Sequence, residues 1–103
     1  MYIDEFIKGW LVGDFEPTLI KNKDIEVGVK YYKKGDIEKR HVHKYVTEYT
    51  IVLSGKIVML DKVFYKKNIV KVEPGIATNF EALTDCITLV IKTPSIPSDK
   101  EFV

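Results

Sequence analysis

The sequence predicts an all-β fold in which short strands form a sandwich or barrel. Apolar and polar residues alternate in several short runs, which is the period of a strand with one buried face. Residues that favour turns, mainly glycine, proline, asparagine and aspartate, separate these runs at close spacing. No segment shows the period of an amphipathic helix. Together these features indicate a β-sandwich or barrel without a long helix.

The first twenty residues combine large apolar side chains with turn formers. They predict a short extended segment, a turn near Gly13 and Asp14, and a further extended piece that ends at Ile20. One tryptophan and two phenylalanines lie in this segment: Trp10, Phe6 and Phe15. We expect these side chains to cover one end of a sheet core or to fill a dimer interface.

The clearest strand is predicted at 25–32, with the sequence IEVGVKYY. Alternate side chains of a strand share a face, so Ile25 and Val27 point to one side and Lys30 and Tyr32 to the other. Further strands are expected at 41–43, 47–53, 57–60, 63–65, 69–72, 76–82 and 86–92. Polar or glycine-containing turns are expected at 33–36, 54–55, 61–62, 73–75 and 83–85.

The expected elements form a single domain over 1–103. Its core lies at 25–92, and an N-terminal arm with short strands occupies 1–24. The tail at 93–103 contains Pro94 and Pro97, which exclude a regular helix there. We expect an extended arm or a partly disordered end.

The charge balance argues against nucleic acid or an anionic membrane as a partner. The chain has 16 Lys and Arg against 15 Asp and Glu, so its formal net charge is +1. No apolar stretch has the length of a membrane span, and the acidic Asp4 and Glu5 are not typical of a signal peptide. Cys86 is the only cysteine, and we expect it to be a small buried side chain. These features predict a cytoplasmic protein.

Candidate functional residues gather between Gly35 and Gly55. His41 and His43 are the only histidines of the chain, and Glu48 follows five residues after the second. In a strand, His41 and His43 point to the same face. Two imidazoles and a carboxylate on one inner face can form a metal site or an acid–base site.

The spacing of these residues resembles the first motif of the cupin superfamily, which consists of small jelly-roll barrels. That motif is Gly, five residues, His-x-His, three or four residues, Glu, six residues, Gly. Gly35, His41, His43, Glu48 and Gly55 match it at every position. The resemblance implies a cupin-type double-stranded β-helix over roughly residues 25–92.

The second cupin motif is matched only in part. Pro74 and Gly75 supply its turn, but its leading glycine is absent. Thr78 stands where the family places a fourth metal ligand, a histidine. The neighbouring Asn79 is expected to point outward if Thr78 points inward. The opening and closing stretches also resemble those of small bacterial cupins, some encoded near polysaccharide genes.

The resemblance implies a barrel pocket that His41, His43 and Glu48 line as metal ligands and catalytic residues. This donor set suits Fe, Mn, Zn or Ni and leaves open positions for a small-molecule substrate. No organic cofactor is expected. The candidate substrate-binding residues are Tyr49, Thr78 and Lys30. Lys30 can meet a phosphate or carboxylate if its strand face is the inner one.

Three alternatives to metal chemistry stay open. Some metal-free cupins are isomerases or epimerases of nucleotide-linked sugars, and here His41 or His43 would be the base and Tyr31, Tyr32 or Tyr49 the acid. The chain could instead be a non-enzymatic module that binds a sugar, an acid or an ion. The histidines and Glu48 could also form a hydrogen-bonded cluster with a structural role only.

Small barrels of this kind commonly pair through sheet edges and N-terminal segments. The apolar surface of the N-terminal aromatic residues is difficult for a chain of 103 residues to cover alone. We therefore expect a homodimer.

Overall fold

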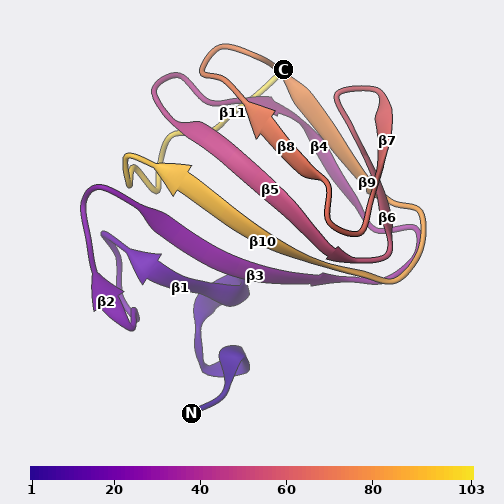
Figure 1. The fold of residues 1–103 in the computed structure, drawn as a ribbon. Helices are drawn as coiled ribbons and strands as arrows, with labels where there is room; N and C mark the ends of the chain where they lie inside the picture. The colour runs from indigo at the N-terminus through magenta and orange to yellow at the C-terminus, as the bar shows by residue number, and fades with distance from the viewer.

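Two β-sheets face each other in the computed structural model, which describes residues 1–103 (Figure 1). The larger sheet has the strand order β2-β1-β3-β10-β5-β8, and the smaller has the order β11-β4-β9-β6-β7. The larger sheet consists of β1 (Trp10–Gly13), β2 (Ile20–Lys21), β3 (Glu26–Tyr32), β5 (Thr47–Ser54), β8 (Ile69–Val72) and β10 (Cys86–Thr93). The smaller consists of β4 (Ile37–Val42), β6 (Lys56–Met59), β7 (Lys62–Tyr65), β9 (Thr78–Ala82) and β11 (Glu101–Phe102). The all-β prediction is confirmed.

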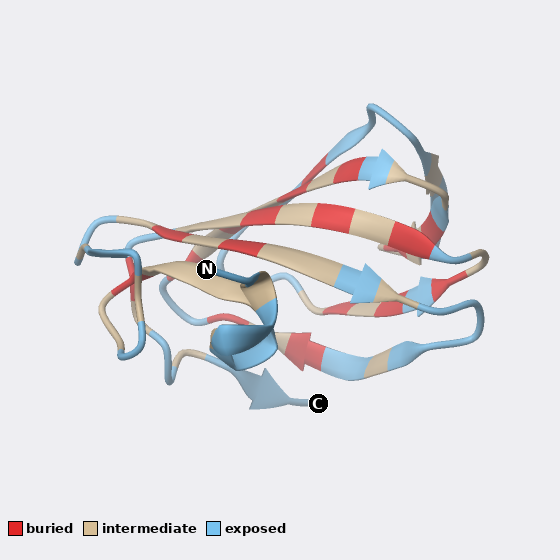
Figure 2. Cartoon of the chain, turned by 90° about the horizontal axis from the view of Figure 1, so that it is seen from below, coloured by how far each residue is buried: buried red, intermediate tan, exposed pale blue.

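The inner face of the larger sheet changes from polar to apolar along its strands. Buried and partly buried residues alternate along β5 and β10, as the bands of Figure 2 show. Glu48, Thr50 and Val52 are the buried side chains of β5. The antiparallel register places Lys92 opposite Glu48 and Thr88 opposite Val52. Glu48 and Lys92, at the polar end of these two central strands, therefore lie next to each other.

The apolar part of the interior lies at the other end of the sandwich. Its buried cluster consists of Val52, Ile57, Met59, Val70, Val72, Phe80, Ala82 and Cys86. Cys86 is a small buried residue, as the sequence predicts. A packed apolar end leaves the opposite end free to carry polar side chains, because the cluster supplies the hydrophobic stabilisation.

The structure corrects the expected N-terminal conformation. Two short 3₁₀ turns, η1 (Ile3–Glu5) and η2 (Ile7–Gly9), precede β1 where an extended segment was expected. Such single turns are too short to leave a helical period in the sequence. The first expected piece forms as β1, but residues 14–19 are bends or irregular, and a strand resumes only at β2, which pairs in parallel with β1.

Two strand boundaries also differ from the expected ones. β4 begins at Ile37 rather than at His41, and it ends at Val42, so that His43 follows the strand. β9 begins at Thr78 rather than at residue 76, because Ile76 donates its N–H to the Glu73 carbonyl in a turn. Pairing with distant strands sets the limits of β4, whereas a local turn sets the start of β9.

The C-terminal tail is ordered against the smaller sheet. β11 pairs antiparallel with β4, with Phe102 opposite His41. This agrees with the expected extended arm. No helix in the structure has the length and apolar composition needed to cross a bilayer.

Candidate metal centre

His41 and His43 point into the interior from the end of β4. Both side chains are buried, with relative exposures of 4% and 2%. Their ring centroids are 5.2 Å apart and the ring planes are nearly perpendicular, at 80°. The predicted shared face is therefore confirmed, although β4 ends between the two residues.

Main-chain carbonyl groups orient both imidazole rings. Nδ1 of His41 lies 2.9 Å from the Lys39 carbonyl oxygen, and Nδ1 of His43 contacts the Asp99 carbonyl oxygen. A carbonyl oxygen can only accept, so Nδ1 of each ring carries a proton and donates it. Each neutral ring then has its lone pair on Nε2, which is the arrangement found in metal-binding histidines.

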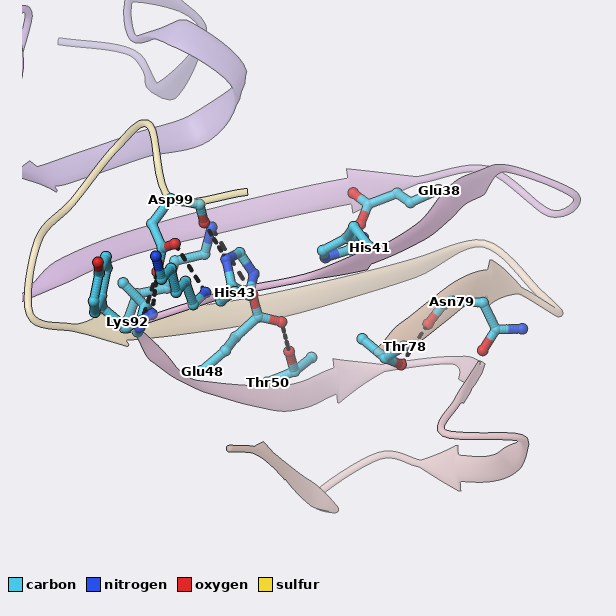
Figure 3. Close-up of polar contacts among 12 residues, drawn as sticks. Glu38, His41, His43, Glu48, Thr50, Thr78, Asn79, Lys92 and Asp99 are labelled. Atoms are coloured by element: carbon cyan, nitrogen blue, oxygen red, sulfur yellow. Dashed lines mark hydrogen bonds and ion pairs between the residues drawn. The ribbon is translucent and has the colours of Figure 1, made fainter. Parts of the chain in front are cut away.

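Glu48 faces the lone pair of His43. Its Oε2 lies 3.4 Å from His43 Nε2, and its Oε1 accepts a hydrogen bond from the Thr50 hydroxyl at 3.3 Å (Figure 3). The Lys92 ammonium is 3.9 Å from Oε2. Burial raises the pKa of Glu48, but the neighbouring His43 and Lys92 outweigh burial and hold this pKa below its usual value. Glu48 is therefore an anion at neutral pH.

The donor atoms fit a metal ion. His43 Nε2 is buried and has no hydrogen-bond partner, and it faces the ionised Glu48. A buried polar atom without a partner destabilises the protein by about 1–3 kcal/mol, which a cation bound at this point would relieve. The donor atoms of His41, His43 and Glu48 all lie within 4.8 Å of one another. Donors about 2.0–2.2 Å from a tetrahedral ion lie about 3.3–3.6 Å apart, so side-chain movements of about 1 Å would complete the site.

A cavity of about 270 Å³ adjoins this cluster at the polar end of the sandwich. His41 and Glu48 line it, whereas His43 does not. The other lining residues are Lys8, Trp10, Lys30, Tyr32, Glu38, Thr50, Met59, Asn79, Phe80, Thr88, Val90, Lys92, Pro97 and Lys100. A small molecule in this cavity would reach two of the three donor side chains.

Solved structures with the same arrangement of strands are jelly-roll proteins. A protein with a double-stranded β-helix domain from Klebsiella pneumoniae is similar over 100% of this chain and 95% of its own, with a TM-score of 0.77 and 15% identity. An RmlC-like cupin from Shewanella frigidimarina has a TM-score of 0.69 and 18% identity, over 74% of this chain and 71% of its own. The chain has the cupin fold.

A third similar structure is a sugar phosphate isomerase of the cupin superfamily from Silicibacter pomeroyi. It has a TM-score of 0.68 and 19% identity, over 78% of this chain and 57% of its own. At such identities the likeness shows the fold alone. No family model and no curated protein matches the sequence. The cupin jelly roll implied by the spacing around His41 is thus confirmed, and the buried His-His-Glu cluster is compatible with a divalent metal.

The cupin barrel brings only one of the three expected substrate-binding residues to the cavity. Lys30 lines it, because the face of β3 that carries Glu26, Gly28 and Lys30 is the inner one. Tyr49 alternates with the inward-facing Glu48 and Thr50, and it lies near Lys71 instead. Tyr49 is therefore outside the cavity.

Thr78 is buried but does not line the cavity. Its hydroxyl accepts the Leu60 N–H at 3.1 Å and donates to the Asn79 carbonyl oxygen at 2.8 Å. The position of the family's fourth ligand thus holds a hydroxyl that main-chain groups already use (Figure 3). Asn79, expected to point outward, is one of the lining residues.

The three tyrosines proposed as acids differ in position. Tyr32 lines the cavity and donates its hydroxyl proton to Glu38 Oε2 at 2.9 Å, whereas Tyr31 is 62% exposed. Burial and the nearby Glu38 raise the pKa of Tyr32 well above its usual value. Tyr32 is therefore the one tyrosine placed for a role in the cavity, and it is a weak acid there.

Several site residues were not anticipated from the sequence. Asp99 orients His43, although the two residues are 56 positions apart. Lys92 and Thr88 share the inner face of β10, which strand alternation alone could have indicated. Trp10 and Lys100 reach the cavity from the N-terminal segment and the tail, and no local signal marks them.

Proposed function

We propose that this cupin-fold protein binds one divalent metal ion through His41, His43 and Glu48, and binds or transforms a small molecule in the adjoining cavity. The observation that carries this proposal is the buried Nε2 of His43, which has no hydrogen-bond partner and faces an ionised carboxylate. A solely structural cluster would need a second proton on His43 to compensate this pair of electron-rich atoms.

In this proposal the protein orients the metal ligands and gives a small molecule access to them. The carbonyl groups of Lys39 and Asp99 hold the two rings with Nε2 directed away from the main chain. His41 and Glu48 connect the donor set to the cavity. A bound metal of this kind acts as a Lewis acid on a carbonyl or phosphoryl oxygen. Three protein donors leave coordination positions for such a ligand.

A second candidate is a metal-free acid–base enzyme that acts on a sugar-like molecule. His41 and Tyr32 line the same cavity, and a similar solved structure is named a sugar phosphate isomerase. Neutral His41 would remove a proton next to a carbonyl through Nε2. The high pKa of Tyr32 makes it a poor proton donor, so this candidate has less support.

The metal content of untagged protein distinguishes these candidates. We expect close to one equivalent of Fe, Mn, Zn or Ni after loading and desalting, and its loss in His41→Ala and His43→Ala. Asn79→Ala is the control, because Asn79 lines the cavity without being one of the three donors. A wild-type protein that retains no metal after loading with each ion would contradict the proposal. Turnover of a sugar phosphate that survives a chelator but fails in His41→Ala would favour the acid–base enzyme.

A further inference from the structure

Positively charged side chains dominate the wall of the cavity. Four lysines line it from four separate segments, and the only carboxylates among the lining residues are Glu38 and Glu48. The four are Lys8, Lys30, Lys92 and Lys100. The wall therefore has two positive charges in excess before any metal binds. A bound divalent cation would increase this excess.

Most of these ammonium groups lack an anionic partner. Lys92 is 3.9 Å from Glu48, but Lys8, Lys30 and Lys100 form no ion pair with any carboxylate. Lys30 donates to the main-chain carbonyl of Lys8. Burial, together with the charges of Lys92, Lys8 and Lys100, lowers the pKa of Lys30 to about 8 despite the opposing effect of Glu38. The cluster thus disfavours its own charge in the absence of an anion.

Trp10 forms a platform beside two of the lysines. The ammonium groups of Lys30 and Lys92 lie 4.0 Å and 4.8 Å from the centroid of its ring. Two like charges over one ring repel each other, so an anion near them would be strongly attracted. An indole ring on the cavity wall can also pack against the apolar part of a ligand.

A buried hydroxyl without a partner also lines the cavity. Thr88 has a relative exposure of 1%, and its Oγ1 forms no hydrogen bond with the protein. In the register of the sheet, Thr88 is directly opposite Lys30. A free hydroxyl next to an unpaired ammonium is a suitable donor pair for one oxyanion group.

We propose that the cavity binds a small organic anion whose carboxylate or phosphate group contacts Lys30, Lys100 and the Thr88 hydroxyl. This inference rests on the small-molecule ligand of the proposed function and gives its chemical class. A volume of about 270 Å³ is slightly below the ~300–1,000 Å³ of pockets for drug-sized ligands. The ligand is therefore the size of a small metabolite, and the excess positive charge serves this molecule rather than a nucleic acid.

Trp10 is the only tryptophan of the chain, so its fluorescence reports directly on this cavity. The protein is titrated with glucuronate and with glucose 6-phosphate, and neutral glucose is the control for both. Malonate is a further probe, with neutral malonamide as its control. We expect a saturable change in emission with at least one anion and none with the neutral compounds. The carboxylate and phosphate probes distinguish the two possible anionic groups. Added salt should weaken the binding, because the attraction is electrostatic.

Lysine variants test which side chains bind the anion. Lys30→Met and Lys100→Met should each raise the Kd roughly tenfold or more. Lys62→Met, on the exposed edge strand β7, should leave it unchanged. Lys100 is exposed, so this variant keeps the test valid if Lys30→Met does not fold.

Titration of metal-free wild type, prepared with a chelator, separates this proposal from the metal site, because the lysines should still bind the anion there. Failure to retain metal would leave the anion response intact. Three results would overturn the anion proposal: equal binding of neutral and anionic probes, wild-type affinity in both lysine variants, or no saturable response to any anion with or without metal.

Discussion

His43 owes its orientation to Asp99, a residue of the C-terminal tail. The carboxylate of Asp99 accepts three main-chain N–H groups, from Lys44, Tyr45 and Val46, at 2.9, 2.8 and 2.9 Å. The carbonyl oxygen of the same residue accepts from Nδ1 of His43. One residue thus fixes both the segment after β4 and the tautomer of a proposed metal ligand.

Asp99→Asn should weaken both the fold and the metal site. The amide can accept through only one of its side-chain atoms, so we expect a loss of about 1.5–3 kcal/mol in the free energy of unfolding. Metal affinity should fall roughly 10–100-fold, as for other groups that orient a ligand. Chemical denaturation and metal titration measure the two effects.

The same substitution should change the pH dependence of stability. Burial opposes ionisation of Asp99, but the three N–H groups and His43 lower its pKa below the usual 3.8. The carboxylate therefore stabilises the fold above pH 3.8, and this contribution disappears as the pH falls through the lower native pKa. Wild type should lose more stability than Asp99→Asn on acidification from about pH 5 to about pH 2. Asp61→Asn, in the exposed turn before β7, is the control. If it reduced the acid sensitivity of stability as much as Asp99→Asn does, the role assigned to Asp99 would be contradicted.

At the scale of elements, β1 and β3 position the tryptophan platform. The Trp10 ring lies over Gly28, and a Cβ added at Gly28 would be 2.7 Å from Cε3 of this ring. Only glycine therefore allows β1 to place Trp10 at the cavity. This explains why a glycine interrupts the alternation of the most clearly predicted strand.

Gly28→Ala should displace Trp10 and destabilise the fold by about 1–3 kcal/mol, because the added methyl group overlaps the ring. A double-mutant cycle with Trp10→Leu tests this contact, and denaturation followed by circular dichroism supplies the four stabilities. The smaller side chain should relieve the overlap, giving a coupling of at least about 0.5 kcal/mol. Additive effects would show that the two residues act independently.

The strands were largely predictable because sheets with a buried face impose a period of two. The patterns of β3, β5 and β10 contain this period over seven or eight residues. The limits of β4 were not predictable, since pairing with β11 and the hydrogen bonds that the next residues donate to the Asp99 carboxylate determine where it ends. Sequence patterns record burial within an element and carry no record of a distant partner.

The same reasoning explains which parts of the site were found. His41, His43 and Glu48 were recognisable because the only two histidines of the chain occur at a motif spacing. Asp99 and Lys100 were missed because the tail has no regular period and lies outside the motif spacing that marks the histidines. Tyr49 was misplaced because its hydroxyl suggested chemistry, whereas the alternation of β5 directs it away from the cavity.

At the scale of the whole molecule, apolar residues remain exposed near the N-terminal turns. Ile37 and Tyr31 have relative exposures of 71% and 62%, and both line a surface groove with Ile3 and Phe6. Trp10, which was expected to cover a sheet end or fill an interface, lines the cavity instead. An interface between two copies would cover this groove.

We expect a homodimer through this groove at micromolar concentration, measured by sedimentation velocity. Ile37→Asp should weaken dimerisation roughly tenfold or more, since it places a charge in an apolar contact. Ile69→Asp is the matched control, because Ile69 is 63% exposed on β8 at the other edge of the larger sheet. A wild-type protein that sediments as a single chain, or dissociation caused by Ile69→Asp alone, would contradict this arrangement.

The central claim is that His41, His43 and Glu48 bind one metal ion. An anomalous difference map from metal-loaded crystals, collected at the absorption edge of the bound metal, tests it most directly. We predict a single strong peak about 2.0–2.2 Å from Nε2 of both histidines and from a Glu48 carboxylate oxygen. A map from loaded crystals with no peak among these three side chains, or with its peak elsewhere in the protein, would contradict the claim.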